Sequence, residues 1–363
     1  MQGAPILEID LDKITVNTER VVATCRERGI RVLGVTKGFS AMQEIVRAML
    51  DGGIEGLADA RMENIIELRK KDFHNPITLL RIPRLSNVDN VVQYADASIN
   101  SEVSVIQALS VAALRMEKRH NIILMVDVGD LREGIMKENV LDTVSQISNL
   151  PGVNLIGVGT NMGCFGGILP SVANLGLLVK LGLAVEHQLG RKLDIISGGG
   201  TSTLFLVEKN MVPAGINQLR IGEGILLGTD TTNNRSIPWL CQDAFCLSAE
   251  VIEVKDKPSV PIGEVGKDAF GNTPQFIDEG IRKRAILALG KQDVYIEGVF
   301  PMDNTVKILG ASSDHTIVDI TDASRDIAVG SELIFGLTYP GLLSASDSRY
   351  VKKRFKGGRF HEN

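Results

Sequence analysis

Five segments of the chain end a run of apolar residues with groups that can do chemistry. Lys37 follows the run RVLGVT, so an amine is delivered to a position that should be shielded from water. An amine that has lost water has a lowered pKa and becomes a nucleophile able to condense with an aldehyde. A lysine at a strand end more often extends into solvent. Lys37 therefore becomes a candidate only in combination with the other four segments.

Those four segments combine glycines with polar and charged side chains. VDVGDLREG presents Asp127 and Arg132, and GVGTNMGCFGG presents Asn161. The turn ISGGGTSTLF frees backbone N–H groups and adds hydroxyls, and LRIGEGILLG carries Arg220 before a second flexible turn. Exposed N–H groups next to a helix start are typical of anion binding. A tight turn without a ligand is the simpler explanation of each glycine cluster, but two such turns together with Lys37 favour a phosphate site.

The reactive segments belong to a repeating order of strand and helix. Continuous apolar strands separated by helices predict a parallel sheet that is covered by helices. Eight such units in roughly 200 residues favour a closed (β/α)₈ TIM barrel, with an open doubly wound sheet as the alternative, and barrel enzymes place reactive groups where the strands end. The eight predicted strands are 31–36, 54–58, 77–81, 95–99, 121–127, 153–159, 193–197 and 217–221.

The composition changes after about residue 230, where short β-branched runs separated by Gly, Pro and Asp replace the strand–helix order. We therefore expect an α/β chain with a barrel over residues 10–230 and a C-terminal all-β domain over residues 231–363, with residues 1–9 as a candidate addition to the β domain. The segment KKRFKGGRFHEN is expected to be a charged tail.

Composition and charge narrow the class of ligand. The chain has 363 residues, 44% hydrophobic and 23% charged, and its net charge of -5 argues against a nucleic-acid partner or a polybasic membrane anchor. The four cysteines follow no zinc spacing, the N-terminus lacks the regions of a signal peptide, and no apolar stretch is long enough to span a bilayer. We expect a small-molecule ligand, no metal site, reduced thiols and a cytoplasmic protein.

The order VTKG, DVGDLREG, TNMGCFG, SGGGTS and LRIGEG resembles that of the pyridoxal-phosphate enzymes of the alanine racemase superfamily. The resemblance covers nearly the whole chain. Longer segments, among them PIGEVGKDAFGN and ILGASSDHTIVDITD, are most similar to ornithine racemases and the amino-acid racemases grouped with them. The resemblance implies an amino-acid racemase with pyridoxal 5'-phosphate as cofactor, active as a homodimer with shared active sites.

The same resemblance implies a role for each candidate. Lys37 would bind the cofactor covalently and move the α-proton on one face. Arg132 is similar to an arginine near the cofactor's phenolic oxygen, and Asn161 stands where alanine racemases have a histidine against the ring. Arg220 would face the pyridine nitrogen, and because a guanidinium does not give up its proton, that nitrogen stays unprotonated, which favours racemisation over transamination or decarboxylation. The phosphate is expected on Ser197, Gly199, Gly200, Thr201, Gly222, Glu223 and Tyr339.

The second acid/base is left open by the sequence. Alanine racemases place a tyrosine of the partner subunit on the opposite face of the cofactor, and the matching residue in this chain is Lys291. The other candidates are His315, Tyr339 and Asp314. Asp314 is the first choice because it matches an aspartate that reaches the substrate in related enzymes. Its carboxyl would need to hold a proton near neutral pH, which burial could supply.

Two other functions and the choice of substrate also stay open. A non-catalytic carrier of pyridoxal phosphate would share the barrel but not the β domain. A D-threonine-type aldolase would share the barrel and the lysine but typically needs a divalent metal. A basic substrate such as ornithine would require a carboxylate opposite its distal ammonium, and the carboxylates available for this are Glu264, Asp268, Asp278 and Asp314.

Overall fold

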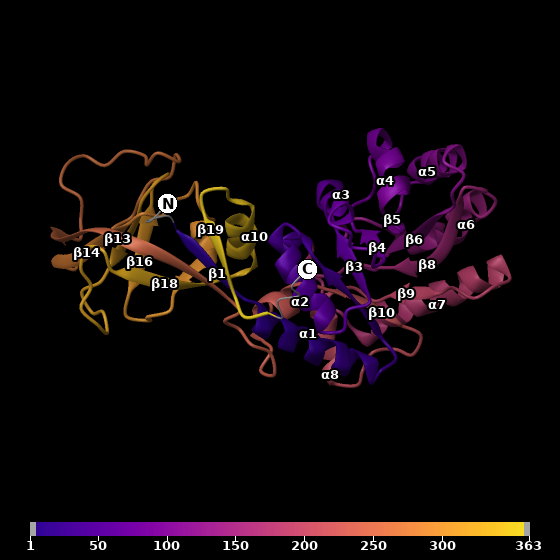
Figure 1. Cartoon of the computed structure of the whole chain (residues 1–363), viewed down its shortest axis with the longest axis horizontal. Coiled ribbons are helices and arrows are strands. Elements are labelled where there is room, and N and C mark those ends of the chain that lie inside the picture. The colour runs from indigo at the N-terminus through magenta and orange to yellow at the C-terminus, as the bar shows by residue number, and fades with distance from the viewer. Residues whose placement is uncertain (1–4, 359–363) are drawn as a thin grey trace. The chain divides into compact units, whose positions relative to one another are not determined.

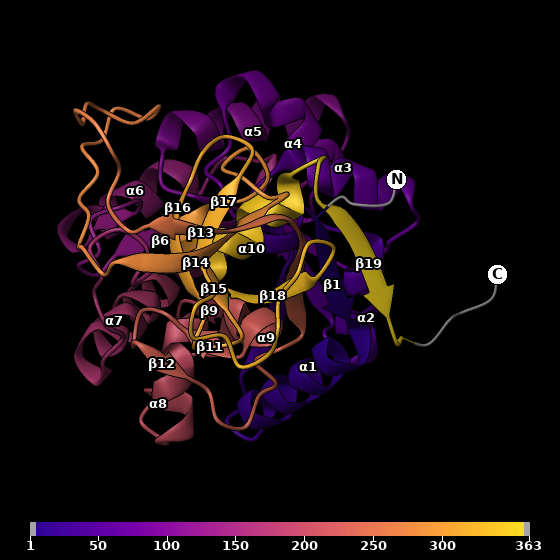
Figure 2. The same ribbon diagram turned by 90° about the vertical axis from the view of Figure 1, so that its left-hand side faces the viewer.

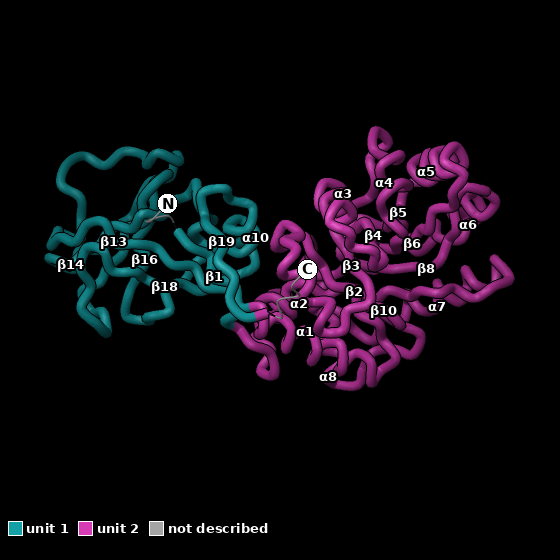
Figure 3. The backbone as a smooth tube through the Cα atoms, viewed as in Figure 1, with its two compact units in different colours: residues 1–10, 243–357 teal, residues 11–242, 358–363 magenta. Residues whose placement is uncertain are grey.

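The structure is a computed structural model that describes residues 5–358. It divides into two compact units, drawn in different colours in Figure 3. The β unit comprises Met1–Asp10 and Asp243–Gly357, and the barrel unit comprises Leu11–Gln242 and Gly358–Asn363. Each unit is described by itself below.

The barrel unit contains all eight predicted strands, which run parallel and form one closed sheet. Neighbouring strands pair in the order β5-β4-β3-β2-β10-β9-β8-β6, and the additional pairing of β5 with β6 closes the barrel. The expected (β/α)₈ fold is therefore confirmed. The strands are β2 (Arg31–Val35), β3 (Gly56–Asp59), β4 (Ile77–Leu79), β5 (Ala97–Asn100), β6 (His120–Asp127), β8 (Val153–Gly159), β9 (Ile195–Ser197) and β10 (Gln218–Ile221).

Helices surround this barrel, and Figure 2 shows α1 to α8 arranged in a ring. The ring forms because each helix buries one apolar face against the strands, as β-strands buried on both sides require. Short segments follow several strands, including η1 (Lys37–Phe39), η4 (Thr201–Thr203) and the two-residue strand β7 (Ile135–Met136). The helices are α1 (Leu11–Arg26), α2 (Gln43–Asp51), α3 (Met62–Lys70), α4 (Val88–Tyr94), α5 (Val103–Arg115), α6 (Val140–Ile147), α7 (Val172–Leu189), α8 (Leu204–Glu208) and α9 (Glu223–Leu227).

The interior of the barrel is packed rather than open. Ile99, Ile123 and Met125 are buried at its centre, and three half-buried side chains pack against them from neighbouring strands. These three are Leu80, Ile156 and Ile195. A filled interior makes the strands a rigid support, so any ligand must bind where the strands end.

The barrel unit extends further along the chain than residue 230, where the sequence places its end. The buried Asn17 on α1 donates hydrogen bonds to the backbone oxygens of Ile225 (3.0 Å) and Cys241 (2.9 Å), and its Oδ1 accepts one from the N–H of Cys241 (2.7 Å). The hairpin of β11 (Thr229–Asp230) and β12 (Arg235–Ser236) lies between these two anchored points. The hairpin is therefore held against the barrel by one buried amide.

The β unit is built mainly from antiparallel strands, shown in Figure 1, as expected for the second part of the chain. Its main path runs β15-β18-β13-β14-β17-β16, and β1 pairs with both β13 and β19. The strands are β1 (Ile6–Asp10), β13 (Phe245–Pro258), β14 (Ile281–Leu287), β15 (Val299–Pro301), β16 (Lys307–Ala311), β17 (Thr316–Asp319), β18 (Glu332–Leu337) and β19 (Lys352–Lys356).

Two details of the β unit differ from the expectations. The segment expected to be a tail contains β19, which pairs parallel with β1 and forms ion pairs from Arg354 to Glu8 (3.3 Å) and from Lys356 to Asp10 (3.6 Å). The lysines and arginine of β19 lie on an exposed strand edge. In the sequence, such a run of charges looks like a charged tail. The expected β domain also contains one helix, α10 (Tyr339–Asp347), with a proline in its first turn that is compatible with a helix start. Residues 359–363 lie outside the described part.

Candidate active site

Lys37 follows the end of β2 at the first position of η1, where the sequence predicts it. Its side chain is half-buried, and no residue among 5–358 forms a hydrogen bond or ion pair with its amine. Burial lowers the pKa of Lys37; the charge of Arg132 adds to this effect, while Cys164, Asp59 and Glu133 oppose it. An unpaired amine with a lowered pKa can act as a nucleophile or a base.

Arg220 is buried on β10, the strand beside β2. Its Nη1 donates to the hydroxyl of Ser197, and its Nη2 donates to the backbone oxygen of Thr160 at 2.7 Å and to Oδ1 of Asn161 at 2.6 Å. Burial lowers the pKa of Arg220 to about 10, so the group still carries its charge at neutral pH. Three of its five N–H groups are used in this way, and neither the Nε–H nor the second N–H of Nη1 donates to a described residue, so the fixed cation can still donate to a bound acceptor.

Glu133, which the sequence analysis did not single out, joins three of the predicted groups. Arg132 donates to both carboxylate oxygens of Glu133, from Nη2 at 2.5 Å and from Nε. Asn161 donates to the same carboxylate through Nδ2, and its Oδ1 accepts the bond from Arg220. We call the chain Arg132–Glu133–Asn161–Arg220–Ser197 the site network. The sequence feature that could have pointed to Glu133 is its position directly after Arg132.

The two glycine-rich turns lie against each other. The backbone N–H of Gly224 donates to the hydroxyl of Thr201 at 3.2 Å, and the N–H of Arg220 donates to the oxygen of Gly199 at 2.9 Å. Gly199 has φ of +101°, a conformation that favours glycine. The first turn of a helix leaves its N–H groups without acceptors in the helix, and η4 and α9 both begin here. Ser197 differs from the prediction in one respect, since its buried hydroxyl bonds Arg220.

Glu223 is the first residue of α9, where an anion is expected to bind, but its carboxyl is bound by the hairpin that follows the helix. Its Oε1 accepts hydrogen bonds from the hydroxyls of Thr229 (2.8 Å) and Thr231 (2.5 Å) and from the backbone N–H of Thr231 (2.9 Å). Burial raises the pKa of Glu223, against the effect of these hydrogen bonds. Both features reduce the repulsion that this carboxyl would exert on an anion at the start of the helix.

Asp59 ends β3 next to β2, and it is a second group that the sequence analysis missed. It is fully buried, and it accepts hydrogen bonds from the hydroxyl of Thr36 (2.5 Å), the N–H of Arg61 (2.7 Å) and Nδ2 of Asn64. Burial raises the pKa of Asp59. The predicted strand 54–58 stops one residue before it, so the rule that selected Lys37 would also have selected Asp59.

The candidates for the second acid/base lie in the β unit. Lys291, Asp314 and His315 come from two turns that are hydrogen-bonded to each other, since the N–H of Lys291 donates to the oxygen of Ser312 at 3.0 Å. Asp314 is exposed in this chain, and it accepts a bond from Nε2 of Gln292 at 3.1 Å. Tyr339 begins α10. The burial expected to keep Asp314 protonated is not provided by its own unit.

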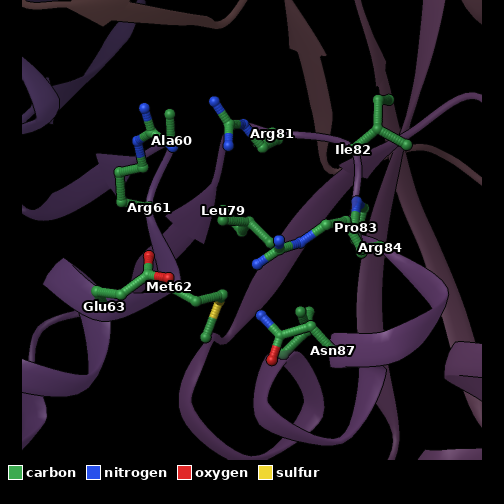
Figure 4. A pocket seen from close by; sticks show the side chains of 11 residues that line it. Ala60, Arg61, Met62, Glu63, Leu79, Arg81, Ile82, Pro83, Arg84 and Asn87 are labelled. Atoms are coloured by element: carbon green, nitrogen blue, oxygen red, sulfur yellow. The ribbon is translucent and has the colours of Figure 1, made fainter.

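A separate pocket lies at the ends of β3 and β4, beside Asp59 (Figure 4). The side chains of Arg61, Arg81 and Arg84 line it, and none of the three forms an ion pair with a described carboxylate. Its volume of about 100 Å³ admits only a small group. The pocket does not include Lys37, Arg132 or Arg220, so the chemistry predicted for those residues belongs to a different part of the barrel end.

The groups described above fit a molecule that carries an aldehyde, a phosphate and a ring nitrogen. Lys37 supplies an unpaired amine, the adjoining turns at Thr201 and Gly222 supply backbone N–H groups, and Arg220 supplies a free Nε–H. Among residues 5–358, no cluster of three or more His, Cys, Asp or Glu side chains is arranged to hold a metal ion. In the same range, no helix combines the length and apolarity needed to cross a bilayer.

Comparisons with known proteins identify the family and the fold. Residues 9–229 match the family model of the alanine racemase N-terminal domain. The chain is 42% identical over 352 residues to a lysine racemase of Thermotoga maritima, covering 97% of this chain and 98% of that one. It is 40% identical over 350 residues to an ornithine racemase of Acetoanaerobium sticklandii, covering 96% and 99%. Its fold is similar to an alanine racemase of Streptomyces lavendulae, with a TM-score of 0.77 at 17% identity over 99% of each chain.

Proposed function

The chain belongs to the alanine racemase family, and from this premise we propose that it interconverts the L- and D-forms of a basic amino acid with pyridoxal phosphate. Its activity class is that of an amino-acid racemase, and the enzymes of the family use pyridoxal phosphate. The observation that carries the finer proposal is the pair of Lys37, an amine with a lowered pKa, and Arg220, a fixed cation on the adjacent strand.

Pyridoxal phosphate, when bound to an amino acid, withdraws electrons and makes the α-proton acidic. In this proposal the amine of Lys37 holds the cofactor and moves the α-proton on one face. Its lowered pKa supports both roles, because the neutral amine is the reactive form. Arg132 lies close enough to Lys37 to affect that pKa, which supports its assignment to the phenolic oxygen.

The phosphate is assigned to the backbone of Gly199, Gly200, Thr201, Gly222 and Glu223. The contact between Thr201 and Gly224 supports one continuous binding surface from the two turns. Arg220, whose Nε–H is free, would face the ring nitrogen and keep it unprotonated. We also retain Tyr339 as a phosphate contact, on the basis of family resemblance.

We assign the second proton transfer to Asp314, with Lys291 and His315 from the same pair of turns as alternatives. Since Asp314 is exposed in the single chain, the proposal includes a homodimer in which the β unit of one subunit completes the site of its partner. Covering the carboxyl in that way would supply the burial that it needs to hold a proton.

The substrate class is proposed from the relatives and from the free carboxylates. A lysine or ornithine side chain needs an anion for its distal ammonium. Asp268 already accepts hydrogen bonds from Phe270 and Asn272, and Asp278 accepts them from Ser259 and Gly280. Asp314 accepts them from Gln292 and Ser313. Glu264 has no hydrogen-bond partner among the described residues, so it keeps the most capacity for the distal ammonium.

The direct test is isotope exchange at the α-carbon. The purified protein with pyridoxal phosphate is incubated with L-lysine, L-ornithine, L-alanine or L-serine in D₂O, and the products are separated on a chiral column. The proposal predicts D-lysine or D-ornithine with deuterium at the α-carbon. A carrier protein would give no exchange, and an aldolase would instead release aldehyde from a β-hydroxy amino acid; either outcome contradicts the proposal.

Replacing Lys37 with alanine provides the control. Because the residue would serve as both the attachment point and a base, the Lys37→Ala rate should fall by about 10⁴-fold. Lys13, on α1, provides a matched lysine-to-alanine change outside the site. Lys13→Ala should racemise like the unaltered protein.

A further inference from the structure

We infer that Glu133 is a positioning residue, which orients Arg220 through Asn161 and balances the positive charges at the barrel end. This inference rests on the proposed function and assigns a group that the sequence analysis did not use. Its side chain is only 17% exposed, although it is charged. A carboxylate in such a place requires partners, and all of its recorded partners belong to the site network.

The loop after β6 is shaped to present this carboxylate. Gly134 has φ of +136°, and a Cβ at this position would come within 2.5 Å of the backbone nitrogen of Asp127. Leu131 has φ of +54°, which is unfavourable for a leucine, and its N–H is held by the carboxylate of Asp127 at 3.2 Å. Strained backbone of this kind persists where the surroundings fix it, and it concentrates at functional sites.

A second carboxylate locks this loop to the loop that carries Asn161. Asp130 is buried, and it accepts hydrogen bonds from the N–H groups of Gly163 (3.0 Å) and Phe165 (3.1 Å). The two loops follow β6 and β8, which are adjacent strands. Because Asp130 joins them, the contact between Glu133 and Asn161 is held by the fold on both sides.

The polarity of the chain of bonds depends on Glu133. A carboxylate only accepts hydrogen bonds, so the Asn161 amide must present Nδ2 to Glu133 and Oδ1 to Arg220. Because a guanidinium only donates, Arg220 requires the same orientation of the amide from the other side. A partner at 133 that could also donate would compete with Arg220 for Oδ1 of Asn161, so the acceptor-only carboxylate of Glu133 keeps that oxygen available to Arg220 and supports the direction of its free Nε–H.

The negative charge of Glu133 has an effect in addition to its role as a hydrogen-bond acceptor. Lys37, Arg132 and Arg220 bring three cationic groups to one barrel end, and Glu133 stabilises the charged form of each. The other ionisable groups that act on Lys37 are Asp59, whose raised pKa opposes its own ionisation, and Cys164. Asp59 and Cys164 act on Lys37 more strongly than Glu133 does, but Glu133 is the carboxylate that acts on all three cations.

The test compares Glu133→Gln with Glu138→Gln. Glu138 lies five positions further along, in η3 (Lys137–Asn139), and forms only an exposed ion pair with Lys137 at 3.7 Å. In the full chain freed of cofactor, the pH dependence of Lys37 acetylation by acetic anhydride is followed by peptide mass spectrometry. Losing a nearby negative charge, which also leaves the charge of Arg132 without its partner, should move the labelling midpoint of Lys37 to lower pH in Glu133→Gln only.

The loaded enzyme supplies the second readout. A misdirected Arg220 should slow racemisation by about 10- to 100-fold, and it should raise the amount of keto acid released per racemisation, because the ring nitrogen is then less strictly held unprotonated. Adding Asn161→Asp to Glu133→Gln restores a carboxylate next to Arg220. The double variant should recover the labelling midpoint and lower the keto-acid yield relative to Glu133→Gln.

The outcomes separate this inference from the proposed function. If the unaltered protein racemises no basic amino acid, the proposed function fails, whereas the labelling shift would still report the charge of Glu133. If the unaltered protein is a racemase but Glu133→Gln matches Glu138→Gln in labelling midpoint and keto-acid yield, the positioning role is wrong. A loss of rate alone, with no change in either of these readouts, would also overturn it.

Discussion

Two polar clusters in the same barrel differ in the charges that they carry. The site network lies at the carboxyl ends of the strands and carries full charges on Arg132, Glu133 and Arg220. The second cluster lies on β5 and at the start of β6, where His120 shares a hydrogen bond of 2.9 Å with the hydroxyl of Ser98. We call Ser98, Asn100 and His120 the histidine cluster.

The difference between the clusters comes from the cationic side chain that each contains. Burial lowers the pKa of Arg220 to about 10, so the guanidinium stays charged at neutral pH, and three oxygen acceptors hold it in place. Burial lowers the pKa of His120 to about 4, against the effect of the more distant Asp96, so this side chain is neutral at physiological pH. Burial thus acts on both groups in the same direction, and the charge remains only on the guanidinium, because its ordinary pKa is far above that of an imidazole.

The largest expected effect comes from Arg220→Lys. A lysine keeps the charge but cannot reproduce the three directed hydrogen bonds of the guanidinium together with its free Nε–H. Racemisation should fall by about 10²- to 10³-fold, and steady-state kinetics with D- and L-substrates would measure it. An Arg220→Lys variant that keeps the normal rate would show that a positive charge alone is enough, and the contrast between the clusters would lose its functional meaning.

The histidine cluster should instead control stability as a function of pH. His120 has a folded-state pKa of about 4 against 6.5 when free. The unfolded chain therefore binds a proton first as the pH falls, so stability is lost between pH 6.5 and pH 4, and the loss reaches about 3 kcal/mol below that window. Urea unfolding between pH 4 and pH 7.5 would measure it.

His120→Gln serves as the matched variant for that titration. The free energy of unfolding of the variant should decrease less steeply between pH 6.5 and pH 4 than that of the unaltered protein, because the titrating group is absent. Racemisation per folded molecule at pH 8 should be unaffected. Equal pH slopes for the two proteins would place the acid sensitivity elsewhere.

A smaller effect is expected from Ser98→Ala, which removes the partner of a buried ring nitrogen. The cost should be about 1 to 2 kcal/mol of unfolding free energy, because one buried donor or acceptor is left unsatisfied. The same type of change at Ser145, an exposed residue of α6, should cost far less. If both variants unfold at the same denaturant concentration, the hydrogen bond to His120 contributes little.

The smallest expected effect is a difference in reactivity between two cysteine thiols. Cys25 is fully buried on α1, and burial raises its pKa to about 12, while Cys164 is exposed in the loop after β8. Thiol reagents act on the thiolate, so Ellman's reagent should modify Cys164 in the folded protein and reach Cys25 only on unfolding. Adding pyridoxal phosphate should slow the reaction of Cys164, since that thiol lies near Lys37. Protection of Cys25 rather than Cys164 would contradict the site.

Much of the fold and part of the site could be predicted from the sequence. The apolar runs reveal all eight barrel strands because a parallel strand buried on both faces needs continuous apolar residues. Lys37, Asn161 and Arg220 stand out because polar groups at such strand ends cannot serve the core. The barrel end brings Asn161 and Arg220 into contact, which the sequence did not predict.

The rest depends on contacts that sequence spacing does not contain. Glu133 meets Asn161 across 28 positions, and Ser197 meets Arg220 across 23. A glutamate beside an arginine is also common on protein surfaces, where the pair contributes little. The β19 strand was missed for a similar reason, because its charges are those of an exposed edge and its partner β1 lies at the other end of the chain.

The proposed active site depends most on the amine of Lys37, which is assigned to hold the cofactor. The protein loaded with pyridoxal phosphate is reduced with borohydride, digested, and its peptides are analysed by mass spectrometry. We predict that the added pyridoxyl phosphate mass lies on Lys37 alone, and that labelling disappears in Lys37→Ala. A label on another lysine, or undiminished labelling in Lys37→Ala, would contradict the assignment of the active site.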